Sequence, residues 1–114
     1  MQEQTHPIQS IEEELAEAEL SLHSGNDGRA RVQSRRAVGL AVTAWHASRG
    51  EFSRRPAIEY LRHIAQDAAL PTPVQKAAAR LIKNVNDRLS ADYTLHPVRD
   101  ARIIITYFLQ RLTP

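Results

Sequence analysis

Arginine side chains are the most prominent chemical groups in this sequence. Arg29, Arg31, Arg35 and Arg36 fall within eight consecutive residues, and Arg102 lies near the C-terminal end. A guanidinium group carries a permanent charge and five donors, a combination that suits phosphates and carboxylates. We therefore predict a binding surface formed by these five arginines, for a protein, RNA or nucleotide partner.

The four clustered arginines fall on two sides of a predicted helix. At about 100° per residue, Arg29 and Arg36 flank one side of an alanine seam, and Arg31 and Arg35 flank the other. One neighbouring helix cannot cover both sides, so one pair is expected to stay free for a partner. The alternative is that these arginines are solvated or pair with acids inside the chain, which adds at most about 1 kcal/mol per exposed pair.

A formal net charge of +2 conceals an uneven charge distribution. Residues 1–27 carry seven acids and no lysine or arginine, whereas residues 28–62 carry eight arginines and two acids. If these two segments pack side by side, opposite charges meet within the chain. The acidic segment of one copy can equally face the basic segment of another, and that contact weakens with added salt.

A carboxylate–imidazole series is the only metal-like spacing in the sequence. Glu59, His63 and Asp67 recur every four residues on one helical face. Basic neighbours and the lack of Glu-x-x-His pairs indicate a solvated face instead. There is no cysteine to complete a zinc site, so we predict no metal and no cofactor.

Motifs for covalent catalysis are absent from the sequence. It contains no Gly-x-Ser-x-Gly, no glycine-rich phosphate loop and no serine or cysteine nucleophile beside a base. We therefore assign no catalytic residue and favour a non-enzymatic interaction module. An RNA-processing enzyme and a DNA-binding bundle remain as alternatives, the latter disfavoured because 70–73 is typical of an ordinary helix connection.

Apolar residues at helical spacing predict a single all-α domain over 1–114, an up-and-down bundle of about five helices behind a loose lead-in at 1–9. The helices are expected at about 10–24, 29–48, 53–69, 73–89 and 97 to nearly 114. Ser10 with Glu13 predicts a capping box, and 25–28 predicts a tight turn with Asp27 as a cap. The predicted core comprises Val38, Ala41, Trp45, Leu61, Leu81, Ile105 and Phe108.

Hydropathy argues against a membrane protein. The longest apolar stretch, 37–45, is far shorter than the roughly 20 residues of a spanning helix. The N-terminal residues lack a signal-peptide pattern, and the absence of cysteine fits a reducing compartment, so a cytoplasmic location is expected. Val42 and Ile103 lie outside the main apolar seams, which predicts a homodimer that covers them.

Two segments resemble the HEPN superfamily of small helical-bundle proteins, specifically its bacterial branches. They are residues 28–41, GRARVQSRRAVGLA, and residues 95–108, LHPVRDARIIITYF, and the likeness extends over about 12–111. It implies a bundle of four or five helices, frequent homodimerisation and, in many members, metal-independent RNA cleavage or nucleotide binding.

The ribonuclease motif of that superfamily is not complete in this chain. Its catalytic members place a histidine four to six residues after an arginine. Arg102 is followed at this spacing by Tyr107, and seven residues separate Arg88 from His96. Tyrosine, with a reference pKa near 10, is a poor proton acceptor at neutral pH. The resemblance therefore implies a non-catalytic member in which Tyr107 is a packing residue.

Overall fold

Five α-helices make up most of the chain that the computed structural model describes, residues 7–90 and 93–112. They are α1 (Pro7–His23), α2 (Asp27–Ser48), α3 (Ala57–Gln66), α4 (Thr72–Ile82) and α5 (Pro97–Leu109), with a 3-10 turn, η1 (Val85–Asp87). No strand occurs in these residues. The predicted all-α bundle is confirmed.

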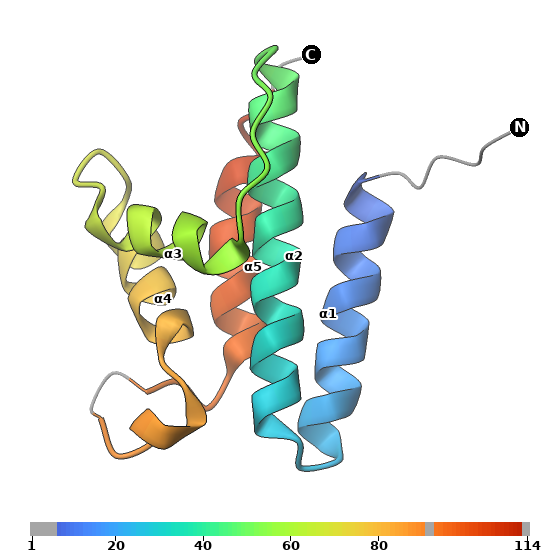
Figure 1. The fold of residues 1–114 in the computed structure, drawn as a ribbon, viewed down its shortest axis with the longest axis vertical. Helices are drawn as coiled ribbons and strands as arrows, with labels where there is room; N and C mark the ends of the chain where they lie inside the picture. The colour runs from blue at the N-terminus through green and yellow to red at the C-terminus, as the bar shows by residue number, and fades with distance from the viewer. Residues whose placement is uncertain (1–6, 91–92, 113–114) are drawn as a thin grey trace, which may run out of the picture.

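Helix α2 is the central element of the bundle. It packs against α1, α3 and α5. In Figure 1, α1, α2 and α5 run along the long axis of the molecule, whereas α3 lies across that axis on the opposite side of α2 from α1, with α4 beside it. The central helix therefore has one neighbour on one flank and three helices on the other.

The first helix begins earlier than expected. It starts at Pro7 instead of Ser10, since a proline in the first turn loses no intrahelical hydrogen bond. Ser10 lies inside the helix, so the predicted capping box does not form. Residues 7–9 of the predicted lead-in are therefore helical, and they are exposed, while residues 1–6 lie outside the described part.

The tight turn between α1 and α2 is confirmed, but a different residue caps the second helix. Gly25 has a φ of +80°, which glycine adopts without steric cost. The Asn26 side chain accepts a hydrogen bond from the backbone N–H of Arg29 at 3.1 Å. Asp27, the predicted cap, is the first residue of α2.

Helices α3 and α4 are shorter than predicted. Helix α3 begins at Ala57 instead of Ser53, because Pro56 disfavours helical geometry at the residue before it. Helix α4 ends at Ile82 instead of near 89, and Lys83 is already extended. Leu89, the last residue of the predicted helix, is 97% exposed. Helix α5 ends at Leu109, also before the predicted limit.

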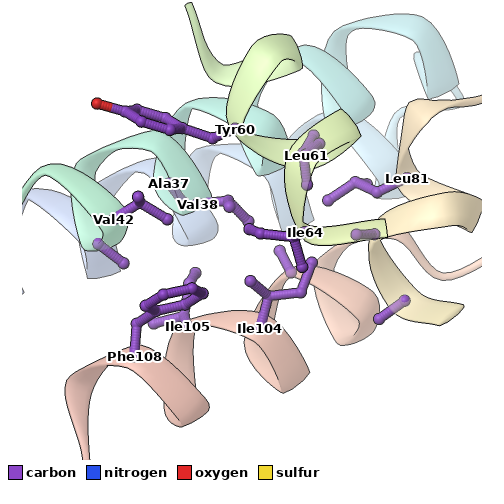
Figure 2. Packing of buried hydrophobic residues seen from close by; sticks show 14 of the residues in the cluster. Ala37, Val38, Val42, Tyr60, Leu61, Ile64, Leu81, Ile104, Ile105 and Phe108 are labelled. Carbon is purple, nitrogen blue, oxygen red and sulfur yellow. The ribbon is translucent and has the colours of Figure 1, made fainter. Parts of the chain in front are cut away.

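The hydrophobic core lies around α2, and side chains from all five α-helices contribute to it, with Ile11, Leu15 and Ala18 supplied by α1. Figure 2 shows Val38, Leu61, Leu81, Ile105 and Phe108 in this cluster, all predicted to be buried. The remaining two predictions differ in outcome: Ala41 is buried, whereas Trp45 is only partly buried and rests edge-on against Phe108, with ring centroids 5.4 Å apart.

One argument for a homodimer fails. Val42 was expected to need a second copy to cover it, but α3 and α5 already bury it to 3% exposure. Ile103 is also partly buried against the core of the same chain. Any self-association must therefore use a different surface.

Side-chain contacts join the segment before α5 to the start of α2. The Tyr93 hydroxyl donates a hydrogen bond to the Asp27 carboxylate, and the Arg31 guanidinium lies 4.3 Å from the Tyr93 ring centroid. Burial and the hydrogen bond to Asp27 raise the pKa of Tyr93, although the charge of Arg31 acts in the opposite direction. The stability that Tyr93 gives to this segment therefore depends on pH in the alkaline range.

The substitution Tyr93→Phe is expected to lower the free energy of unfolding by about 1–2 kcal/mol at neutral pH, because the Asp27 carboxylate loses its donor. Since the pKa of Tyr93 is raised in the folded chain, its hydrogen bond contributes fully below pH of about 10 and is lost as the pH rises through the folded pKa. Urea unfolding from pH 7 upward should show the difference from the wild type shrinking above pH of about 10.

Tyr60→Phe is the matched control. Burial raises the pKa of Tyr60, but hydrogen bonds that include those from Ser53 and the Arg55 backbone outweigh it and lower the pKa overall. The difference in the free energy of unfolding between Tyr60→Phe and the wild type should therefore increase over the same alkaline range. A Tyr93→Phe difference that stays constant with pH would contradict the assignment.

Candidate functional site

The two arginines on one side of α2 are structural. Arg31 is only 1% exposed. Its Nε donates to the Lys83 carbonyl at 2.8 Å, its Nη1 to the Thr94 carbonyl at 2.9 Å and its Nη2 to the Arg80 carbonyl at 3.2 Å. All three nitrogens of the guanidinium group are therefore engaged within the fold.

Arg35 completes the same arrangement one turn further along α2. Its Nε donates to the Leu81 carbonyl at 2.8 Å, and its Nη2 donates to the carbonyls of Ile82 and Lys83 at 3.1 and 2.8 Å. Burial, and to a lesser degree the charge of Arg31, lower the pKa of Arg35. Two cations thus satisfy the carbonyl groups at the C-terminal end of α4, where the helix dipole is negative.

The other pair, Arg29 and Arg36, is exposed. Together with Val32 and Leu40, these arginines form one solvent-facing stripe along α2, at the three- and four-residue spacing of a helical face. The stripe alternates cationic and apolar side chains. The structure therefore separates the four clustered arginines into a buried pair and an exposed pair, and only the exposed pair is open to a partner.

A groove of about 500 Å³ runs between α1 and α2. Its α2 side carries Arg29, Arg36 and Leu40, and its α1 side carries Ser10 and three glutamates, Glu13, Glu14 and Glu17. We call these residues the α1–α2 groove. In the described part of the chain no ion pair shorter than 4 Å joins these two helices, so the charges in the groove are available to a partner.

The floor of the α1–α2 groove is held by a buried polar contact. The Gln33 amide lies 2.8 Å from the Ser21 hydroxyl, and both side chains are buried. With its amide nitrogen toward α1, Gln33 also places its oxygen 3.3 Å from Nε of Arg29.

Arg36 and Leu40 border a second hollow, which includes Arg54 and Arg55. The surface therefore continues beyond the groove.

Arg102 lies apart from this groove. It is exposed on α5 and pairs with Glu12 of α1, with Nη2 and Oε1 3.1 Å apart. Tyr107, five residues later, is about 140° around the helix and faces a different pocket, between α2, α3 and α5. The structure therefore does not bring Arg102 together with the other predicted binding residues, and it does not bring Arg102 together with Tyr107.

The carboxylate–imidazole series on α3 is a surface feature. His63 is largely exposed, and its Nε2 lies 3.9 Å from Oδ2 of Asp67. Glu59 pairs with Arg55 at 3.6 Å. No cluster of three metal-binding side chains occurs among the residues that the structure covers. Within those residues, too, no helix is long and apolar enough to cross a bilayer.

A further concave feature, on α2, α3 and α5, was not predicted from the sequence. Aromatic side chains of α2, α3 and α5 border a pocket of about 250 Å³. We call it the aromatic pocket. Trp45 and Phe108 were assigned to core stripes, and Tyr107 was expected to be a packing residue. Nothing in their spacing indicated a cavity, because the three segments meet only in the folded chain.

Comparison with known proteins adds no relative. No family model matches the chain, and neither the curated proteins nor the solved structures provide a match. Functional inference therefore rests on the geometry described above.

Proposed function

We propose that this chain is a non-enzymatic helical interaction module whose α1–α2 groove binds a protein partner, and that this partner is a second copy of the chain. The observation that carries the proposal is the pairing of an acidic α1 face with a basic, partly apolar α2 face along one open groove. We place this activity in the cytoplasm, in keeping with a chain that has no cysteine.

Charge complementarity supports a twofold contact. A twofold axis across the groove sets the glutamates on α1 of one copy opposite Arg29 and Arg36 of the other, and the reverse contact follows by symmetry. Val32 and Leu40 supply exposed apolar area in the same stripe. Burying such side chains gives the contact a hydrophobic contribution in addition to its charges.

The same groove is poorly suited to nucleic acid. Glu13, Glu14 and Glu17 border it, and carboxylates repel the phosphates that Arg29 and Arg36 attract. The two arginines on the opposite side of α2 already bind backbone carbonyls and are not available. A protein surface with both signs of charge fits this groove better than an RNA backbone does.

The HEPN relationship remains a second proposal, and it rests on the two segments that carry the resemblance. An all-α bundle is compatible with it. An enzymatic role within that family is disfavoured by one observation, the separation of Arg102 from Tyr107 on opposite flanks of α5. We therefore favour the binding function over RNA cleavage.

Arg36→Glu is expected to weaken the dimer at least about tenfold, because it places like charges across the interface. Adding Glu13→Arg to the same chain should restore much of the affinity, since the double variant exchanges the positive and negative charges at these two positions. Sedimentation velocity and light scattering over a range of protein and salt concentrations measure both effects. Wild-type association is expected to weaken with salt.

Arg62→Glu is the matched control, because it reverses one exposed arginine on α3, away from the α1–α2 groove. Its dimerisation should equal that of the wild type. A chain that stays monomeric up to high micromolar concentration contradicts the homodimer. A dimer indifferent to Arg36→Glu contradicts the groove, and salt-sensitive RNA binding that depends on Arg36 supports the nucleic-acid alternative instead.

A further inference from the structure

The aromatic pocket lies on the other flank of α2 from the α1–α2 groove. Trp45 of α2, Tyr60 of α3 and Tyr107 and Phe108 of α5 border it, and Val42 is among its apolar lining residues. No residue borders both the pocket and the groove. Pockets lined mainly by aromatic and apolar groups with a few polar ones are typical of small-molecule sites.

The size of the pocket limits its ligand to one ring with a short arm. Its volume is about 250 Å³, whereas an apolar cavity of about 150 Å³ is enough to hold benzene. The difference leaves room for a few further non-hydrogen atoms. A nucleotide or an extended peptide segment does not fit in this space.

The polar rim presents one cation that lacks a carboxylate partner in the described part of the chain, Arg111. Its guanidinium group lies 3.7 Å from the Tyr107 ring centroid, and its Nη1 donates to the Tyr107 carbonyl at 3.1 Å. These two contacts hold the side chain in place while Nε and Nη2 stay available. A carboxylate is the natural partner for such a group.

Two other rim residues, Asp67 and His46, have contacts within the chain. Asp67 accepts a hydrogen bond from the Ala69 backbone at 3.0 Å and lies 3.9 Å from His63. His46 binds Glu51 through Nδ1 at 2.9 Å. Arg111 is therefore the one lining residue of the pocket that carries a permanent positive charge.

A cationic ligand is disfavoured although the walls are aromatic. Aromatic cages bind ammonium groups through open ring faces. Here Arg111 covers Tyr107, and the Arg49 guanidinium lies 5.0 Å from the Trp45 ring centroid. Two of the rings already interact with cations of the chain, and a third cation nearby would be repelled.

We infer that the aromatic pocket binds a small aromatic carboxylate, with its ring among Trp45, Tyr60 and Phe108 and its carboxylate at Arg111. The ring gains from burial and from edge contacts with the aromatic walls. The carboxylate gains a charge-assisted hydrogen bond. This inference does not depend on the proposed dimer.

Phenylacetate is the first probe, and Trp45 is the reporter because it is the only tryptophan in the chain. Titration should give saturable fluorescence changes with a Kd of about 0.1–1 mM, as expected for a ligand of this size. Phenylacetamide, which has the same shape without the charge, should bind about fivefold more weakly. Phenylethylammonium should bind more weakly still.

Arg111→Gln should weaken phenylacetate about fivefold and leave phenylacetamide unchanged, because only the charged contact is lost. Arg102→Gln, an exposed arginine of α5 outside the pocket, is the matched control and should bind phenylacetate as the wild type does. Amide NMR spectra verify that both variants stay folded. Absence of saturable binding, equal affinity for the three probes, or equal loss for both neutral and charged probes in Arg111→Gln would overturn the inference.

Discussion

Arg31→Met is expected to lower the free energy of unfolding by about 3–5 kcal/mol, because it removes three buried hydrogen bonds from a charged donor, each of which contributes about 1.5–3 kcal/mol before the apolar burial of methionine offsets part of the loss. The guanidinium donates to the carbonyls of Arg80, Lys83 and Thr94 and is almost fully buried. Methionine fills much of the same volume but donates no hydrogen bond. The Thr94 carbonyl then loses its donor, whereas the Lys83 carbonyl keeps the bond from Arg35 and the Arg80 carbonyl keeps the bond from the Lys83 backbone N–H.

Thermal unfolding followed by circular dichroism measures this effect. A loss of this size lowers the Tm of a chain of this length by roughly 10–20 °C. Arg31→Lys should recover little, because a lysine ammonium cannot reproduce the fixed fork that reaches three separate carbonyls. The Tm values of Arg31→Met and Arg31→Lys can be compared with that of the wild type in one series of measurements.

Arg29→Met is the matched control for Arg31→Met. Both residues are arginines in the first half of α2, but the Arg29 side chain is exposed. Its replacement should change the free energy of unfolding by less than about 0.5 kcal/mol. Equal stability of the two variants would contradict the structural role assigned to Arg31.

The fold was largely predictable because periodicity records which face of a helix is buried. Val38, Leu61 and Ile105 were predicted to be buried from helical spacing alone, and all three are in the core. Helix ends were less predictable because they depend on tertiary contacts. Helix α4 stops at Ile82, where its last carbonyls bind Arg31 and Arg35, and no local residue pattern near Ile82 records that distant contact.

The candidate site was predictable only in part for the same reason. The helical wheel correctly separated Arg29 and Arg36 from Arg31 and Arg35, and only the fold shows which pair is buried. Sequence reasoning expected acids as the internal partners of these side chains, whereas backbone carbonyls fill that role for Arg31 and Arg35. A charged residue type alone does not distinguish a ligand-binding cation from a helix-capping one.

Phe108→Ala is expected to lower the free energy of unfolding by about 3–5 kcal/mol, because it deletes a buried ring and leaves a cavity. Phe108 is 5% exposed and contacts Trp45 and Tyr107 edge-on, with ring centroids 5.4 and 5.3 Å away. Phe108 also borders the aromatic pocket. The new cavity therefore joins an existing opening, and we expect a value near 3 kcal/mol, since water and neighbouring side chains partly fill it.

The second phenylalanine provides the control within the same chain. Phe52 lies between α2 and α3 and is 94% exposed, so Phe52→Ala removes the same atoms without leaving a cavity. Its free energy of unfolding should stay within about 0.5 kcal/mol of the wild type. Urea unfolding of the two variants separates the effect of burial from the effect of deleting a phenylalanine ring. Similar losses at both positions would contradict the placement of Phe108 in the core, and with it the α5 wall of the aromatic pocket.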